Sequence, residues 1–153
     1  MPIKNSTRRI SPLDINKNVS IGVAFPLDDT NMFKGTQTLK EQVKANLINV
    51  LLTAPGERVN EPNFGVGLRH QLFENNINKE DLKARIEDQV KLYIPEIEVT
   101  NVSITKSNDS HELYIGLYYR VLVNNEEAAI QVNFTQDNGL NNSDLYSPDI
   151  GEY

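Results

Sequence analysis

The sequence predicts a single α+β domain, in which an N-terminal strand and amphipathic helices pack on a C-terminal antiparallel β-meander. Two observations predict this class. Apolar residues recur at helical spacing over residues 36–54 and 78–94, and they alternate with polar residues over most of residues 97–134. Because the helical and strand patterns fall in separate blocks, we expect the helices to cover one face of an antiparallel sheet.

Length and composition indicate one domain with polar ends. The chain has 153 residues, of which 39% are hydrophobic, and this is enough for one core. Residues 1–18 are polar without a clear period, and we expect an extended N-terminal arm. Residues 19–135 form the expected domain. Residues 136–153 are mostly polar or acidic, and we expect a flexible tail.

The first half of the domain predicts a strand followed by a helix. Residues 19–25 alternate between apolar and small or polar side chains, which is typical of a half-buried strand. Thr36 or Thr38 can cap the following helix, and Pro55 and Gly56 end it. The apolar side chains expected on its inner face are Leu39, Val43, Leu47, Val50 and Leu51.

Two further helices are predicted before the meander. A short one spans residues 66–73. Asn78 can cap the next helix, with Asp81 three residues later, and Pro95 ends it. Its expected inner face consists of Leu82, Ile86, Val90 and Tyr93.

Three strands are predicted in the second half. The alternation that begins at Ile97 changes phase near Asn101, which a β-bulge would absorb. The longest alternation runs over residues 113–123, a turn is expected at residues 124–127, and a third strand ends near Phe134.

Charge and cysteine content exclude several classes of partner. The formal net charge is −6, and the basic residues are scattered apart from Lys4, Arg8 and Arg9, so neither nucleic acid nor an anionic membrane is an expected partner. The absence of cysteine excludes disulfides and thiolate metal sites. No signal peptide is visible, and no apolar run approaches the roughly 20 residues that span a bilayer.

No motif of catalysis or cofactor binding is found. His70 and His111 stand in different predicted elements without zinc-type spacing, so we expect no metal site. No nucleophile elbow, phosphate loop or dinucleotide fingerprint occurs, so no cofactor is expected. Glu57 and Glu61 resemble a glycosidase pair, but Arg58 between them would lower carboxylate pKa values, which is wrong for a general acid. We therefore expect no catalytic residue.

Residues 53–74 carry the most informative pattern. Prolines and glycines fix the backbone around Arg58, which stands between Glu57 and Glu61. Two interpretations remain open: Arg58 forms a salt bridge to Glu57 or Glu61 within its own loop, or it is presented to a carboxylate or carbonyl group of another protein. The apolar residues assigned to the core rather than to an interface are Phe64, Leu68, Leu72 and Phe73.

These residues form a pattern that resembles the GPW/gene-25-like family. The pattern consists of Gly56-Glu57-Arg58, Pro62-Asn63-Phe64-Gly65, Gly67-Leu68 and Leu72-Phe73-Glu74. The family comprises baseplate wedge subunits of contractile phage tails and includes the TssE subunit of type VI secretion baseplates. The resemblance extends from about residue 36 to residue 135 and leaves out the arm and the tail.

The resemblance implies a structural virion protein without enzymatic activity, located in the tail baseplate and assembled in the host bacterial cytoplasm. Family members start sheath polymerisation: their sheet accepts strands from the tail sheath protein, and a charged loop docks on the wedge core-bundle proteins. Central hub or tube proteins are further candidate partners. The family tripeptide Glu-Pro-Arg is not contiguous here, so either glutamate is a docking candidate. The implied docking residues are Glu57, Arg58, Glu61 and Pro62, and the structural motif residues are Gly56, Phe64, Gly65, Gly67, Leu68 and Phe73.

A three-stranded sheet has unpaired edges that invite strand addition, unless the tail covers them. We expect a sheath strand to contact the longest strand, with Leu113, Ile115 and Leu117 fixing its depth.

Two alternative functions are a baseplate subunit of a type VI secretion or related contractile injection system, and a lysozyme-like hydrolase that degrades the cell wall.

Overall fold

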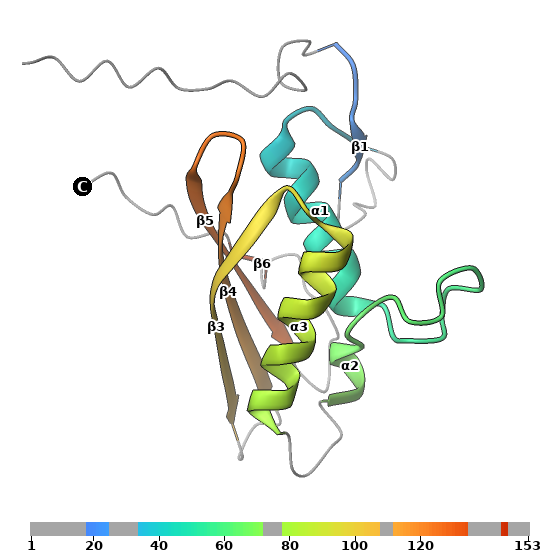
Figure 1. Cartoon of the computed structure of the whole chain (residues 1–153), viewed down its shortest axis with the longest axis vertical. Helices are drawn as coiled ribbons and strands as arrows, with labels where there is room; N and C mark the ends of the chain where they lie inside the picture. Colours follow the sequence, from blue (N-terminus) through green and yellow to red (C-terminus); the bar gives the residue numbers. More distant parts are fainter. Residues whose placement is uncertain (1–17, 25–33, 72–77, 108–111, 135–144, 147–153) are drawn as a thin grey trace, which may run out of the picture.

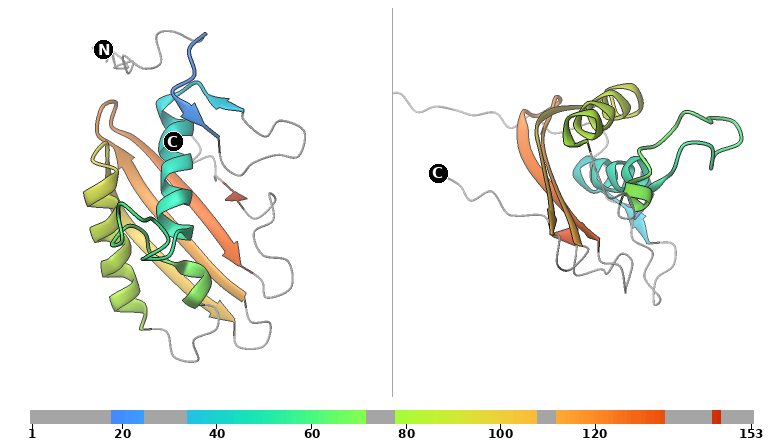
Figure 2. Two further views of the ribbon diagram at one scale, coloured as in Figure 1. Left: turned by 90° about the vertical axis from the view of Figure 1, so that its right-hand side faces the viewer. Right: turned by 90° about the horizontal axis from the view of Figure 1, so that it is seen from below.

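Two helices cover one face of a four-stranded antiparallel sheet in the computed structural model, which describes residues 18–24, 34–71, 78–107, 112–134 and 145–146 (Figures 1 and 2). The helices are α1 (Leu39–Leu52) and α3 (Lys79–Tyr93). The strands, in spatial order, are β3 (Ile97–Ser107), β4 (Glu112–Val121), β5 (Glu126–Phe134) and β6 (Leu145–Tyr146). The predicted α+β class is confirmed. No described helix is both long enough and apolar enough to cross a membrane.

The predicted Asn78 cap is confirmed, and of the two candidates for the first helix, Thr36 and Thr38, the cap is Thr38. The Thr38 side chain accepts a hydrogen bond from the backbone N–H of Glu41, and the Glu41 carboxylate in turn accepts from the Thr38 N–H, which is a capping box. At α3, the Asn78 side chain accepts from the backbone N–H groups of Glu80 and Asp81. These bonds satisfy donors that the first turn of a helix leaves without partners, so each helix begins at a residue fixed by its local sequence.

The core lies between the helices and the sheet. Leu47 and Leu51 of α1, Ile86 of α3 and Ile115 of β4 are fully buried within one hydrophobic cluster. Tyr119 of β4 also points into this layer, and burial, aided by the charge of Glu126, raises the pKa of its hydroxyl to about 12. The core therefore joins the helical half of the chain to the strand half.

The predicted bulge lies in β3. The pairing of β3 with β4 shifts by one residue between Val99 and Asn101, so Thr100 is the extra residue. Without the extra residue, Ile97 and Val102 would point to opposite faces of the sheet. Because of the bulge, both are buried on the face that the helices cover.

Two predicted boundaries in the sheet were wrong. β4 ends at Val121, and the turn covers residues 122–125 rather than 124–127. The turn is set by side-chain chemistry: the Asn124 side chain accepts from the Glu126 N–H, and Asn125 adopts a φ of 54°, in the left-handed region. Leu122 and Val123 therefore lie in the turn and are exposed, although they continue the apolar pattern.

The N-terminal strand is much shorter than predicted. Among the described residues the strand is β1 (Gly22–Val23), which pairs with β2 (Gly35–Thr36) in a separate two-stranded sheet beside the start of α1 (Figure 2). Val19 and Val23 are exposed while Ile21 is half-buried, so the expected face is buried only at Ile21 among the described residues; Phe25 lies outside them. The Gln42 side chain fills the space beside Gly22 and bonds to Thr36, so this sheet packs on a polar contact.

The remaining expectations concern the chain ends and the short helix. α2 spans Leu68–Gln71. Phe73 lies outside the described residues, as do residues 1–17 of the expected arm. Within the tail, residues 145–146 form β6 and pair with Gln131 and Val132 of β5, while the rest of residues 135–153 lies outside the described part.

Candidate functional site

The segment between α1 and α2 forms a projecting loop, residues 54–67, which we call the arginine loop. It extends from the helix layer on the side away from the sheet (Figures 1 and 2). Its base is bonded to the end of α1: Val66 donates its N–H to the carbonyl of Val50 at 2.9 Å, and Gly67 donates to the carbonyl of Thr53 at 2.9 Å. The loop is therefore a fixed projection of α1 at its base.

Backbone hydrogen bonds also close the loop on itself. Gly56 donates its N–H to the Pro62 carbonyl at 2.8 Å, which joins the two sides of the loop. Within the part that this bond closes, Glu61 donates its N–H to the Arg58 carbonyl at 3.3 Å. These bonds hold residues 57–61 as a small closed turn at the end of the projection.

Arg58 lies on an aromatic platform. Its guanidinium carbon is 3.6 Å from the centre of the Phe64 ring, which is a cation–π contact. The Phe64 ring in turn meets Tyr93 of α3 edge-to-face, with ring centres 4.7 Å apart. Phe64 is only 5% exposed, as expected for a core residue, so the arginine lies on a buried ring.

The two loop carboxylates have different local partners. Glu61 accepts from the Arg58 guanidinium at 3.4 Å, which is the within-loop salt bridge that the sequence left open. Glu57 instead accepts the backbone N–H of Ala54 at 2.9 Å, and so holds the start of the loop. The Arg58 and Glu61 side chains remain 39% and 49% exposed, so the pair is a surface pair of small energetic value. The guanidinium remains accessible to a second acceptor.

Exposed groups form the tip of the loop. Val59 is 96% exposed, which is the largest value among the exposed large hydrophobic residues of the described chain. Asn60 and Pro62 are also exposed. The loop thus presents a cation, an apolar side chain and polar groups on one rigid projection.

The structure brings the residues predicted for docking together on one loop, and it adds two supporting side chains from α3. Gly56, Glu57, Arg58, Glu61 and Pro62 lie together at the end of the loop, while the remaining described motif residues, Phe64, Gly65, Gly67 and Leu68, are buried beneath it. The sequence did not point to Gln89 and Tyr93 of α3 as supports of the loop. A weak signal existed for Gln89, which is the only uncharged polar side chain, tyrosine apart, in an otherwise apolar or charged helix.

Leu113, Ile115 and Leu117 lie elsewhere and do not form an edge. All three are on β4, which pairs with β3 on one side and β5 on the other. Their side chains are fully buried under the helices. Main-chain pairing of another strand with β4 would require one of these neighbours to leave.

Neither a metal cluster nor a cleft between paired carboxylates is found at the loop in the part of the chain that the structure describes. Within it, no group of three or more His, Cys, Asp or Glu side chains is placed to hold a metal ion. Glu57 and Glu61 stand on an exposed projection, whereas a glycosidase places its two carboxyl groups across the substrate in a cleft. The fold and site define a small α+β scaffold that carries a rigid arginine-bearing loop.

Comparison with known proteins gives the family. The profile of the family described as baseplate wedge protein gp25 matches residues 37–126, which is more than half of the chain. The chain therefore belongs to the gp25 baseplate wedge protein family, as the residue pattern of the arginine loop indicated.

One curated relative and two solved structures illustrate the similarity. Baseplate wedge protein gp25 of Enterobacteria phage T4 is 29% identical over 87 residues, covering 56% of this chain and 66% of the T4 protein, just under two thirds of its length. A candidate tail lysozyme from Geobacter sulfurreducens superposes with a TM-score of 0.57 at 25% identity, covering 67% of this chain and 95% of that one. A chain of the anti-feeding prophage baseplate has the same fold, with a TM-score of 0.52 at 24% identity and coverage of 65% and 83%.

Proposed function

We propose that this chain is a structural component of a contractile-tail baseplate, located in the virion, that docks on the wedge core-bundle proteins and initiates the sheath by strand sharing. The observation that supports the proposal is that two candidate binding surfaces lie on different layers of the fold. The arginine loop projects from the helix layer, and an open strand edge lies in the sheet layer (Figure 2). One molecule with this geometry can contact the wedge on one side and the sheath on the other.

The arginine loop supplies the wedge contact. The Arg58 guanidinium is held at 3.6 Å over a buried ring and is still 39% exposed, so a partner acceptor can reach it without ordering the side chain first. Preorganisation of this kind reduces the entropy that binding loses. A carboxylate or a row of helix-end carbonyls on the core bundle is a matching acceptor.

The sheet supplies the sheath contact, and β3 is its available edge. In the described chain β3 has one neighbour, β4, while the opposite edge strand β5 is partly covered by β6. An added strand would therefore hydrogen-bond to β3, and not to β4 as the alternation of Leu113, Ile115 and Leu117 suggested. Strand addition of this kind gives affinity through main-chain bonds and register through alternate side chains.

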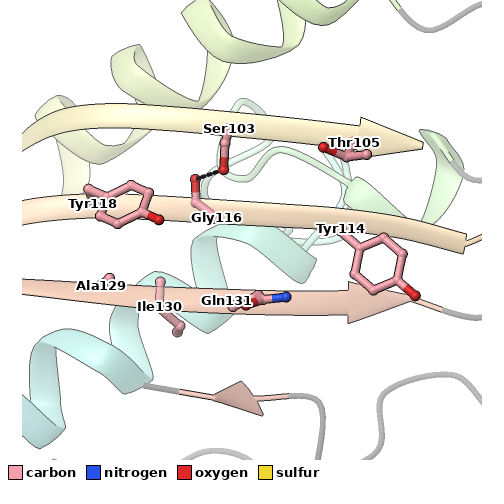
Figure 3. Close-up of a pocket in the computed structure, with 8 residues that line it drawn as sticks. All are labelled: Ser103, Thr105, Tyr114, Gly116, Tyr118, Ala129, Ile130 and Gln131. Atoms are coloured by element: carbon pink, nitrogen blue, oxygen red, sulfur yellow. Dashed lines mark hydrogen bonds between the residues drawn. The ribbon is translucent and has the colours of Figure 1, made fainter. Parts of the chain in front are cut away.

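The sheet face beside this edge is also free of helices. Ser103 and Thr105 of β3 lie on it, next to Tyr114, Gly116 and Tyr118 of β4 (Figure 3). Ser103 donates to the Gly116 carbonyl at 3.4 Å, and Gln131 of β5 also lines this hollow, so polar groups from all three strands lie on this face. A sheath strand on β3 would continue this face.

The edge assignment can be tested by cross-linking, because the natural chain has no cysteine. Ser103→Cys on β3 is expected to form a disulfide with one or two positions of a cysteine series along the sheath strand, since disulfides need Cα atoms roughly 4–7 Å apart. The matched control is Gln131→Cys, on the same face but on β5 beside β6. Cross-links at Gln131→Cys and none at Ser103→Cys would show that the sheath uses the other edge.

We also propose that the chain is not a hydrolase. Each loop carboxylate is exposed and bonded to a group of its own loop, Glu57 to Ala54 and Glu61 to Arg58, so the two do not face each other across a substrate cleft. Purified chain is expected to leave the turbidity of a cell-wall suspension unchanged. Clearing of the suspension by the natural chain, and its loss in Glu57→Gln or Glu61→Gln, would establish the enzymatic alternative.

The same fold would serve a type VI or related contractile injection baseplate, and the genes beside this one would distinguish that machine from a phage tail.

A further inference from the structure

One side chain of α3 forms hydrogen bonds to the backbone on both sides of Phe64, the residue whose ring contacts Arg58. The Gln89 carboxamide accepts the N–H of Gly65 at 2.7 Å and donates to the carbonyl of Asn63 at 3.0 Å. These two groups belong to the peptide bonds that precede and follow Phe64. A single side chain therefore fixes both peptide planes that flank Phe64, because it supplies one acceptor and one donor to the backbone, as a residue of a neighbouring strand does.

A second side chain of α3 sets the ring itself. Tyr93 meets Phe64 edge-to-face at 70°, four residues after Gln89 on the same face of the helix. α3 thus fixes the backbone of Phe64 through Gln89 and its ring through Tyr93. The cation–π contact of Arg58 depends on both, because the guanidinium follows the ring.

We propose that Gln89 and Tyr93 are positioning residues of the docking site: α3 holds Arg58 in its binding orientation through Phe64, without touching the partner. This inference depends on the docking function proposed above. It implies that a substitution inside a helix changes the affinity of a loop on another element. Without the two Gln89 hydrogen bonds, the Arg58 side chain would have to be ordered when the partner binds. This should weaken docking by roughly fivefold, which is the usual effect of immobilising one long side chain.

The test is a double-mutant cycle with Gln89→Met and Arg58→Ala, measured as the dissociation constant for the purified wedge core bundle. Methionine keeps the length of glutamine but makes neither backbone bond. We expect Gln89→Met to weaken binding about fivefold when Arg58 is present and to have no effect when Arg58 is alanine. Lys91→Met is the control, because this exposed α3 position lies about 200° around the helix from Gln89.

The outcomes separate this inference from the docking proposal. Suppose that Arg58→Ala lowers affinity, but Gln89→Met lowers it equally with arginine or alanine at position 58, or has no effect with either. The positioning role is then wrong, while the docking role of Arg58 stands. If Arg58→Ala leaves affinity unchanged, docking itself is wrong.

A measurement on the free chain tests the positioning step without a partner. The Phe64 ring should shift the Arg58 side-chain proton resonances upfield, and Gln89→Met should move them toward the values of a solvated arginine. Unchanged Arg58 resonances in Gln89→Met would overturn the inference, whatever the melting temperature. Gln89→Glu, which keeps an acceptor for Gly65 but sets an oxygen against the Asn63 carbonyl, should give a shift in the same direction.

Discussion

Gly65→Ala is expected to destabilise the fold by about 3 kcal/mol or more, the largest loss that we predict for a change of one methyl group. Gly65 has a φ of +99°, which side chains other than glycine rarely adopt. A Cβ atom there would lie 2.1 Å from the Thr53 carbonyl oxygen. That oxygen also accepts the Gly67 N–H, so it cannot move away without breaking the base of the arginine loop.

Gly56 provides a matched control for this prediction. Its φ of +92° is almost the same, but nothing lies within 4 Å of a Cβ atom built on it. Gly56→Ala should therefore show the backbone strain alone, about 1–2 kcal/mol. Urea unfolding of the two variants measures the difference, with the slope against denaturant as a check on two-state behaviour. Equal losses in both variants would mean that the contact with Thr53 is relieved by movement of the loop.

Arg58→Ala is expected to weaken binding to the wedge core bundle about 30-fold, corresponding to about 2 kcal/mol, because it leaves a partner acceptor without its charged donor. The stability of the free chain should change by less than about 1 kcal/mol. The salt bridge to Glu61 is at the surface, and the contact with Phe64 is partly exposed. Calorimetric titration against the core bundle and thermal unfolding of the free chain measure the two effects separately.

Arg58→Lys distinguishes the roles of charge and shape. Lysine keeps the positive charge but has no planar group to lie on the Phe64 ring, so a loss of about tenfold is expected if the stacked guanidinium is what the partner binds. Affinity equal to that of the natural chain would mean that charge alone is recognised, and the binding should then fall steeply with salt. Natural affinity in Arg58→Ala would remove the docking role altogether.

The elements predicted best from sequence are those fixed by local chemistry. Thr38 and Asn78 cap the helices as predicted, because the cap bonds join residues two or three apart. The bulge near Asn101 was visible as a change of phase, since a strand with one buried face must keep its apolar residues on that face. The arginine loop was recognisable because its prolines, glycines and charges lie within 22 consecutive positions, residues 53–74.

The predictions that failed depended on which neighbours a segment finds. Val19 and Val23 alternate as in a half-buried strand, but β1 pairs only with β2 and leaves them exposed. The alternation over β4 is the strongest in the chain because β4 is an interior strand covered by helices, and this is also why it offers no free edge. An alternating pattern reports burial of one face and carries no information about the order of strands in a sheet.

The sequence by itself determined the α+β class, the positions of the two long helices, the family and the composition of the arginine loop. Only the tertiary structure decided that β3 is an edge strand of the described sheet and that Glu61, not Glu57, pairs with Arg58. It also decided that Gln89 bonds to Gly65 and Asn63, which lie 24 and 26 residues earlier in the chain. The physical reason is the range of the interactions. Caps, turns and periodicity act between residues close in the chain, whereas strand order and the Gln89 hydrogen bonds beside Phe64 exist only after the core has brought distant segments together.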